Sequence, residues 1–225
     1  VALGVNALAN NTTASNNTAV GRNSLVANTS GANNTAIGQA ALCTNLTGGS
    51  NVAVGRCALK LSTASNNVAV GYNSMCTNSS GTENTAIGLN ALRSNTTASQ
   101  NTALGNQTLY TNTTGANNTS VGACSLYANT TGADNTAVGK NTLQANTSGG
   151  CNIAIGNGSL YTNTTGICNS AVGLDALFFN TTGDNNVAFG ALALCKNTTG
   201  ENNTSVGFKS LRANTTGTSN TAMGC

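Results

Sequence analysis

Residues 17–33 read N-T-A-V-G-R-N-S-L-V-A-N-T-S-G-A-N, and units of this pattern follow one another along the whole chain of 225 residues. The glycine that ends the first five letters recurs every seventeen residues, with one unit a residue short between Leu59 and Asn67. It falls at Gly4, Gly21, Gly38, Gly55, Gly71 and onward to Gly224. A fixed period of this size is typical of solenoids, in which each repeat packs only on its neighbours.

The unit predicts an all-β fold, a parallel β-solenoid or β-roll of about thirteen 17-residue coils. Residues 1–225 are expected to form a single repeat domain, which is a segment of a longer chain or of a filament because neither end carries an atypical capping repeat. We number the positions of the unit from 1, the Asn17 of the stretch quoted above, to 17. Position 5 is then the recurring glycine.

The first four positions predict a short strand that ends in a corner at the glycine. Position 4 is apolar in every unit, and position 2 exchanges Thr with Val and Ile. Two residues that are i and i+2 on a strand share a face, and the exchange indicates that this face is the interior. The small residue between them, such as Ala19 or Ser120, would then point outward. The Leu at position 9, as in Leu25, is expected to line the interior as well.

Two further positions are nearly invariant asparagines. The Asn at position 1, such as Asn17 or Asn34, is expected to form a hydrogen-bonded ladder, because stacked buried amides need partners in every coil. The Asn at position 12 begins the segment N-T-T-G. One unit carries Leu46 at position 13, which indicates that position 13 points inward and that positions 12 and 14 point outward.

The composition excludes several functional classes. Charged residues make up 6% of the chain with a net charge of +3, which is too little for electrostatic binding of nucleic acid. No apolar run approaches the roughly 18 residues of a membrane span. The chain has no His, its five acidic residues are scattered, and no phosphate-binding or dinucleotide motif occurs. We therefore expect no enzymatic activity, no cofactor and no metal.

The stretch N-T-A-V-G-R-N-S, from Asn17 to Ser24, resembles the repeat of trimeric autotransporter adhesin heads, and similar N-T-A-[VI]-G units occur in phage tail fibres. The resemblance covers the whole chain and rests on about eight positions in each unit. It implies a left-handed parallel β-roll, often trimeric, that projects from a surface and binds a host or a matrix.

The N-T-T segment creates an N-glycosylation sequon in every unit except the shortened one. The predicted row of sugars would lie along one edge, and the alternative is a ladder of Asn and Thr that happens to spell the sequon. The candidates are Asn11, Asn28, Asn45, Asn78, Asn95, Asn112, Asn129, Asn146, Asn163, Asn180, Asn197 and Asn214.

The eight cysteines fall at variable positions, which we expect to lie on the outside, and none forms a C-x-x-C motif for zinc. Cys151 and Cys168 hold the same position in adjacent coils. Their Cα atoms should lie about 4.8 Å apart, within the range of a disulfide. A bridge and a pair of free thiols both remain open.

Outer positions also carry the aromatic and charged residues. An aromatic group is the candidate contact surface for a partner or a sugar, and partial burial is the alternative: Tyr110, Tyr127, Tyr161, Phe178 and Phe179. Basic residues lie near the corners that follow the Gly or the Leu, and four of the five acids lie just before the strands. These edges of opposite sign would either pair neighbouring copies or remain solvated, since exposed ion pairs contribute little.

These features predict a structural, non-enzymatic subunit of an extracellular fibre or filament, located outside the cell or on a cell or virion surface. Its expected partner is itself, either end to end or as a homotrimer, and glycans are a further candidate. The main alternative is an adhesin head or tail-fibre shaft that binds a host receptor or glycan. A minor alternative is ice binding, which requires a flat outward Thr array, whereas the Thr row here is expected inside.

Overall fold

The computed structural model describes all residues, 1–225, and contains strands joined by turns. Two compact units can be distinguished, Val1–Thr114 and Gly115–Cys225. The expectation of a single domain stays a prediction. The strands of the first unit are β1 (Ala2–Leu3), β2 (Thr18–Val20), β3 (Thr35–Ile37), β4 (Val52–Val54), β5 (Val68–Val70), β6 (Thr85–Ile87) and β7 (Thr102–Leu104).

The second unit repeats this arrangement with seven strands. They are β8 (Thr119–Val121), β9 (Thr136–Val138), β10 (Ile153–Ile155), β11 (Ser170–Val172), β12 (Val187–Phe189), β13 (Thr204–Val206) and β14 (Thr221–Met223). The structure contains no helix that could cross a membrane.

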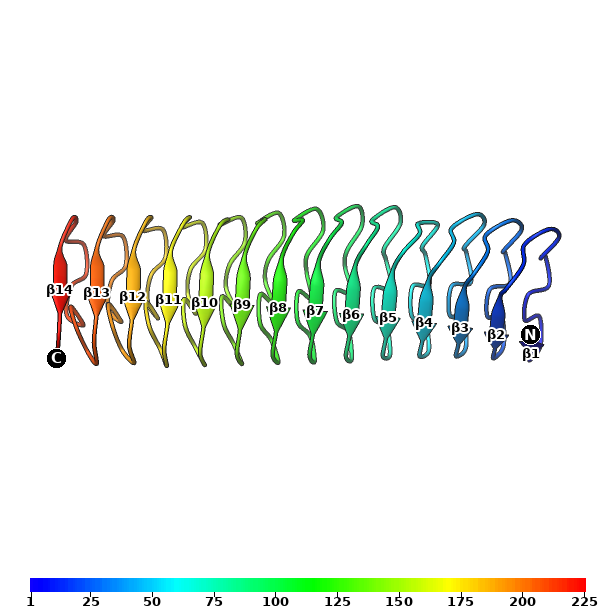
Figure 1. Cartoon of the computed structure of the whole chain (residues 1–225), viewed down its shortest axis with the longest axis horizontal. Helices are drawn as coiled ribbons and strands as arrows, with labels where there is room; N and C mark the ends of the chain where they lie inside the picture. The colour runs from blue at the N-terminus through cyan, green and yellow to red at the C-terminus, as the bar shows by residue number, and fades with distance from the viewer. The chain divides into compact units, whose positions relative to one another are not determined.

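Within each unit the strands lie side by side in chain order and pair in parallel (Figure 1). Equivalent positions of successive units are level with one another, so that Ile153 of β10 lies between Thr136 of β9 and Ser170 of β11. The shortened unit keeps this register, because Val52 pairs with Val68. The predicted fold, a parallel β-solenoid with one coil for each repeat, is confirmed.

The hydrogen-bonded ladder continues beyond the strands around each coil. The Leu25 amide donates to the Ala41 carbonyl of the next coil at 3.0 Å, and the Thr29 amide donates to the Leu46 carbonyl at 2.9 Å. The same bonds recur elsewhere along the chain, for example from Leu92 to Thr108 and from Thr130 to Thr147. Each coil is therefore attached to its neighbour at its turns as well as at its strand, which satisfies backbone groups that a loop would leave to water.

The two faces of each strand are the reverse of the prediction. The small residue at position 3 points inward and is fully buried, as Ala19, Ala103 and Ala154 show. The β-branched and apolar residues at positions 2 and 4 point outward and are half-buried or exposed. The reason is space, because the Leu of position 9 fills the interior opposite the strand and leaves room only for a methyl group or a hydroxyl.

The predicted inward Leu at position 9 is confirmed. From Leu25 to Leu194 every coil buries this residue completely, as Leu25, Met75 and Leu160 show, and Leu8 and Leu211 in the end coils are half-buried. It adopts an unusual backbone conformation, with φ between 45° and 51° in all coils. A left-handed non-glycine residue costs about 1–2 kcal/mol, and complete burial of a Leu side chain offsets this by about 2 kcal/mol.

The glycine at position 5 is required by both conformation and space. Gly38 has a φ of +131°, and a Cβ built on it would lie 2.5 Å from the carbonyl oxygen of Gly55 in the next coil. The corresponding glycines repeat this geometry, with φ from +113° to +141°. Because the obstacle is backbone, no side-chain movement can relieve it.

We predict that Gly38→Ala lowers the free energy of unfolding by about 3–5 kcal/mol, through strain at positive φ and a clash with the next coil. Gly49→Ala is the matched control, because Ala32, Ala116 and Ala133 occupy the same position 16 in other coils. Urea unfolding followed by circular dichroism measures both variants. Equal stability of the two would show that the close approach at Gly38 does not constrain the coil.

Candidate functional site

The first regular feature of the interior is the ladder of position-1 asparagines. The backbone amide of Asn152 and its side-chain Nδ2 both donate to Oδ1 of Asn135, at 3.0 and 3.1 Å. Asn169 donates to Oδ1 of Asn152 in the same way. These side chains are buried from Asn17 to Asn203, and Asn220 is half-buried. The predicted hydrogen-bonded Asn ladder is confirmed.

A second ladder is made by the position-12 asparagines, which are the asparagines of the sequons. Nδ2 of Asn163 donates to Oδ1 of Asn146 at 2.9 Å and also to the carbonyl of Gly166 at 3.0 Å. The Gly166 carbonyl accepts a further bond, of 2.8 Å, from Nδ2 of Asn152. One glycine carbonyl thus joins the two ladders within a coil, and the arrangement recurs at Gly48 and Gly183.

The prediction that the sequon asparagines point outward is therefore wrong. All except two are 0% exposed, whereas Leu46, predicted to point inward, is 48% exposed. An attached sugar would replace a hydrogen of the Nδ2 that holds the ladder together, so the folded coil has no room for it. The buried residues are Asn28, Asn45, Asn78, Asn95, Asn112, Asn129, Asn146, Asn163, Asn180 and Asn197. Asn11 and Asn214, in the end coils, are half-buried.

The shortened coil shows where the missing residue belongs. Ser62 occupies the place of the position-12 Asn, because it is fully buried and its Oγ accepts from Nδ2 of Asn78 at 3.3 Å. The Thr63 amide then donates to the Ser79 carbonyl, as position 13 does in other coils. The deletion thus lies in the turn that follows Thr63, and a hydroxyl replaces one amide of the ladder.

The sequence predicts that all eight cysteines lie outside, and this prediction is wrong for some of them. Cys195 is buried, Cys43, Cys57, Cys76 and Cys124 are half-buried, and Cys151, Cys168 and Cys225 are exposed. Burial raises the pKa of the Cys43, Cys76 and Cys195 thiols. Cys151 and Cys168 are adjacent but free, so the disulfide between them is not formed in this structure. No group of three or more His, Cys, Asp and Glu residues could hold a metal ion.

The predicted aromatic contact residues pack partly on one another. The Tyr161 and Phe178 rings stack in parallel with centroids 4.8 Å apart, and Phe179 meets Phe178 edge to face. Tyr110 accepts a hydrogen bond of 2.6 Å from Arg93 Nη1 of the preceding coil. Tyr110, Tyr127, Tyr161 and Phe178 are half-buried, and Phe179 is exposed. A role of these residues in binding a partner stays a prediction.

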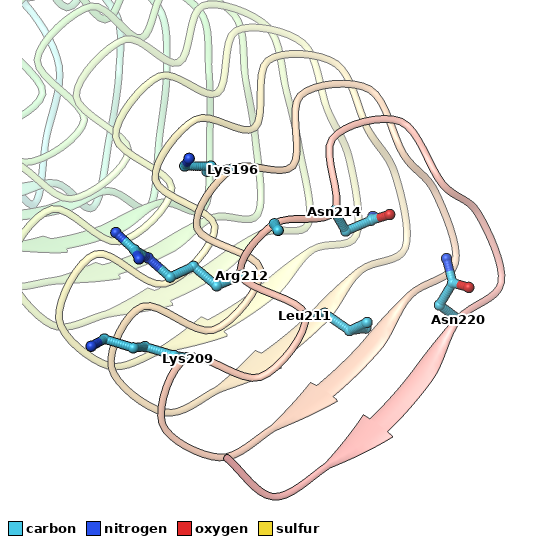
Figure 2. A pocket seen from close by; sticks show the side chains of 7 residues that line it. Lys196, Lys209, Leu211, Arg212, Asn214 and Asn220 are labelled. Atoms are coloured by element: carbon cyan, nitrogen blue, oxygen red, sulfur yellow. The ribbon is translucent and has the colours of Figure 1, made fainter.

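An open hollow of about 590 Å³ lies at the open face of the last coil, where Leu211, Asn214 and Asn220 of the interior ladders line it. Three cationic side chains, of Lys196, Lys209 and Arg212, extend to one side of it, and Asn214 and Asn220 lie on the other (Figure 2). No carboxylate lines the hollow. Its charge therefore suits an anionic group, although its basic residues come from different coils and share no motif.

We predict that Asn152→Ala destabilises the fold by about 3–5 kcal/mol, because the backbone amide and Nδ2 of Asn169 lose their acceptor, and Asn135 Oδ1 and the Gly166 carbonyl each lose one of two donors. Asn157→Ala is the control, because Asn157 is exposed at position 6. Chemical denaturation of both variants measures the difference. An Asn152→Ala change below about 0.5 kcal/mol would mean that the ladder contributes little to stability.

Comparison with known proteins gives no match to any protein-family model, to any curated protein or to any solved structure.

Proposed function

We propose that this chain is a structural, non-enzymatic subunit of an extracellular fibre. The observation that carries the proposal is the repetition of one set of contacts. In coil after coil the position-1 Asn side chain donates to the same Gly carbonyl, and the same Leu is buried. Most conserved positions of the unit therefore serve the stacking of one coil on the next.

The exterior also supports a role as a fibre. Charged residues are few, and outward positions 2 and 4 present β-branched side chains along each unit. The resemblance of the N-T-A-V-G units to repeats of surface adhesins and tail fibres favours a location outside the cell or on a cell or virion surface. Self-association, end to end or as a homotrimer, belongs to the same proposal.

Electron microscopy of the purified full chain tests the fibre role. We expect rods of uniform width that grow in length or associate laterally as the concentration rises, because each coil offers the same contacts. Particles that stay monomeric at every concentration would contradict the proposal.

A second candidate function is adhesion to a host receptor or glycan, and the three exposed cations Lys196, Lys209 and Arg212 on neighbouring coils of the second unit favour it. A sulfated oligosaccharide is a suitable probe, because Lys196, Lys209 and Arg212 can donate charge-assisted hydrogen bonds to its anionic groups.

We expect the triple variant Lys196→Ser, Lys209→Ser, Arg212→Ser to bind that oligosaccharide about tenfold more weakly than the unchanged chain in isothermal titration calorimetry. The control removes three cations elsewhere, by Arg22→Ser, Lys60→Ser and Lys140→Ser. An equal loss in both triple variants would indicate general electrostatic attraction and no site.

The Thr row at position 2, which the sequence predicts inside, lies outside, where an ice-binding surface would have to be. The row is nevertheless interrupted by Val52, Val68, Ile153, Ser170 and Val187, and the neighbouring row at position 4 is apolar throughout. The outer face is therefore no continuous Thr array, and we do not adopt this function.

A further inference from the structure

The outer face of the second unit's sheet is uncovered. Six strands, β8 to β13, each direct two side chains outward, from positions 2 and 4. These residues are Thr, Ser, Val, Ile and Phe, and none is charged. We call this surface the outer sheet face.

An uncovered face of this kind is unusual for parallel strands, because parallel sheets are normally covered on both sides. The inner face packs on the coil's own Leu ladder. On the outer sheet face, Val138, Ile153, Ile155, Phe189 and Val206 are between 36% and 45% exposed. A contiguous apolar surface on a regular sheet marks a site of interaction with another macromolecule.

Charged residues border the outer sheet face in an ordered way. Asp134 lies two residues before β9 and Lys140 lies two residues after it. Glu201 lies three residues before β13 and Lys209 lies three residues after it. All four side chains are exposed. On the coils of β9 and β13 the amino-terminal edge of the face is thus negative and the carboxyl-terminal edge is positive, whereas Asp175 places a carboxylate after β11.

This arrangement is self-complementary for one geometry. If two copies face each other across a two-fold axis parallel to the stacking direction of the coils, their strands run in opposite directions. Asp134 of one copy then lies level with Lys140 of the other, and Glu201 lies level with Lys209. A two-fold axis uses the same patch on both copies, so each pair forms twice. Strands running the same way would instead place like charges together.

We propose that the outer sheet face of residues 115–225 binds the same face of a second copy of this chain, with the strands of the two copies antiparallel. The apolar rows supply the buried centre, and the acidic and basic edges supply the orientation at its rim.

This inference rests on the proposed fibre role, of which it specifies one lateral contact, but the two can fail separately. Fibres that form without this dimer would support the fibre role and overturn the dimer. A dimer that forms without fibres would support the dimer and contradict the fibre role. Sedimentation equilibrium of the full chain at several dilutions measures the dimer, and electron microscopy measures the fibre.

The first test places charge in the centre of the face. Because Ile153 and Ile155 point outward, Ile153→Lys with Ile155→Lys should leave the fold intact and weaken dimerisation at least about tenfold. Leu46→Lys is the matched control, since Leu46 is similarly exposed but lies in a turn, and it should not change the dimer. Circular dichroism confirms folding. A monomeric unchanged chain, a trimer, or an equal effect of both variants would overturn the proposal.

The second test addresses the orientation of the strands. Lys140→Asp would set two carboxylates against each other on the β9 coil, and we expect the dimer to weaken about three- to tenfold at low salt. Adding Asp134→Lys to this variant should restore the original dissociation constant. If Lys140→Asp leaves the dimer unchanged, the strands do not run antiparallel across the interface.

Discussion

The structure depends on one constraint, which is that each coil must lie against a copy of itself one strand spacing away. At that distance like side chains meet like side chains, and a buried amide can be both donor and acceptor to its own kind. The Gly166 carbonyl, which accepts from Asn152 and Asn163, shows how the two Asn ladders are joined within one coil. The same constraint excludes a Cβ at Gly38, where the neighbouring backbone is in the way.

This constraint also explains why the interior is narrow. The Leu at position 9 fills the space facing the strand, and the amides occupy the corners, so only Ala or Ser fits beneath the strand itself. The larger β-branched residues are consequently displaced to the outside. An apolar outer sheet face is therefore the consequence of a small core, and it provides the surface on which the proposed lateral contact depends.

Two kinds of position carry different parts of the proposed function. The ladders make the coil uniform. A sequon asparagine such as Asn146 uses its Nδ2, the atom to which a sugar would be attached, to donate hydrogen bonds to Asn129 Oδ1 and the Gly149 carbonyl. The outer positions differ from coil to coil and hold the charged edges, the stacked Tyr161 and Phe178 rings, and the cations beside the hollow. Structural strength and binding specificity are thus separated in the sequence, since a change at an outer position leaves the ladder intact.

The sequence alone determined the period, the parallel coil, the inward Leu and the position-1 Asn ladder. Each of these follows from repetition, because whatever one unit does its neighbour must also do. Only the tertiary structure decided which face of the strand is inside, since in three residues Thr-Ala-Val the alternation is equally regular from either side. Hydrophobicity favoured Val20 over Ala19 for the interior, and the opposite is observed. Likewise Leu46 lies outside and Asn45 inside, because the amide's partners are the ladder and the Gly48 carbonyl, which are contacts that exist only once the coils are stacked.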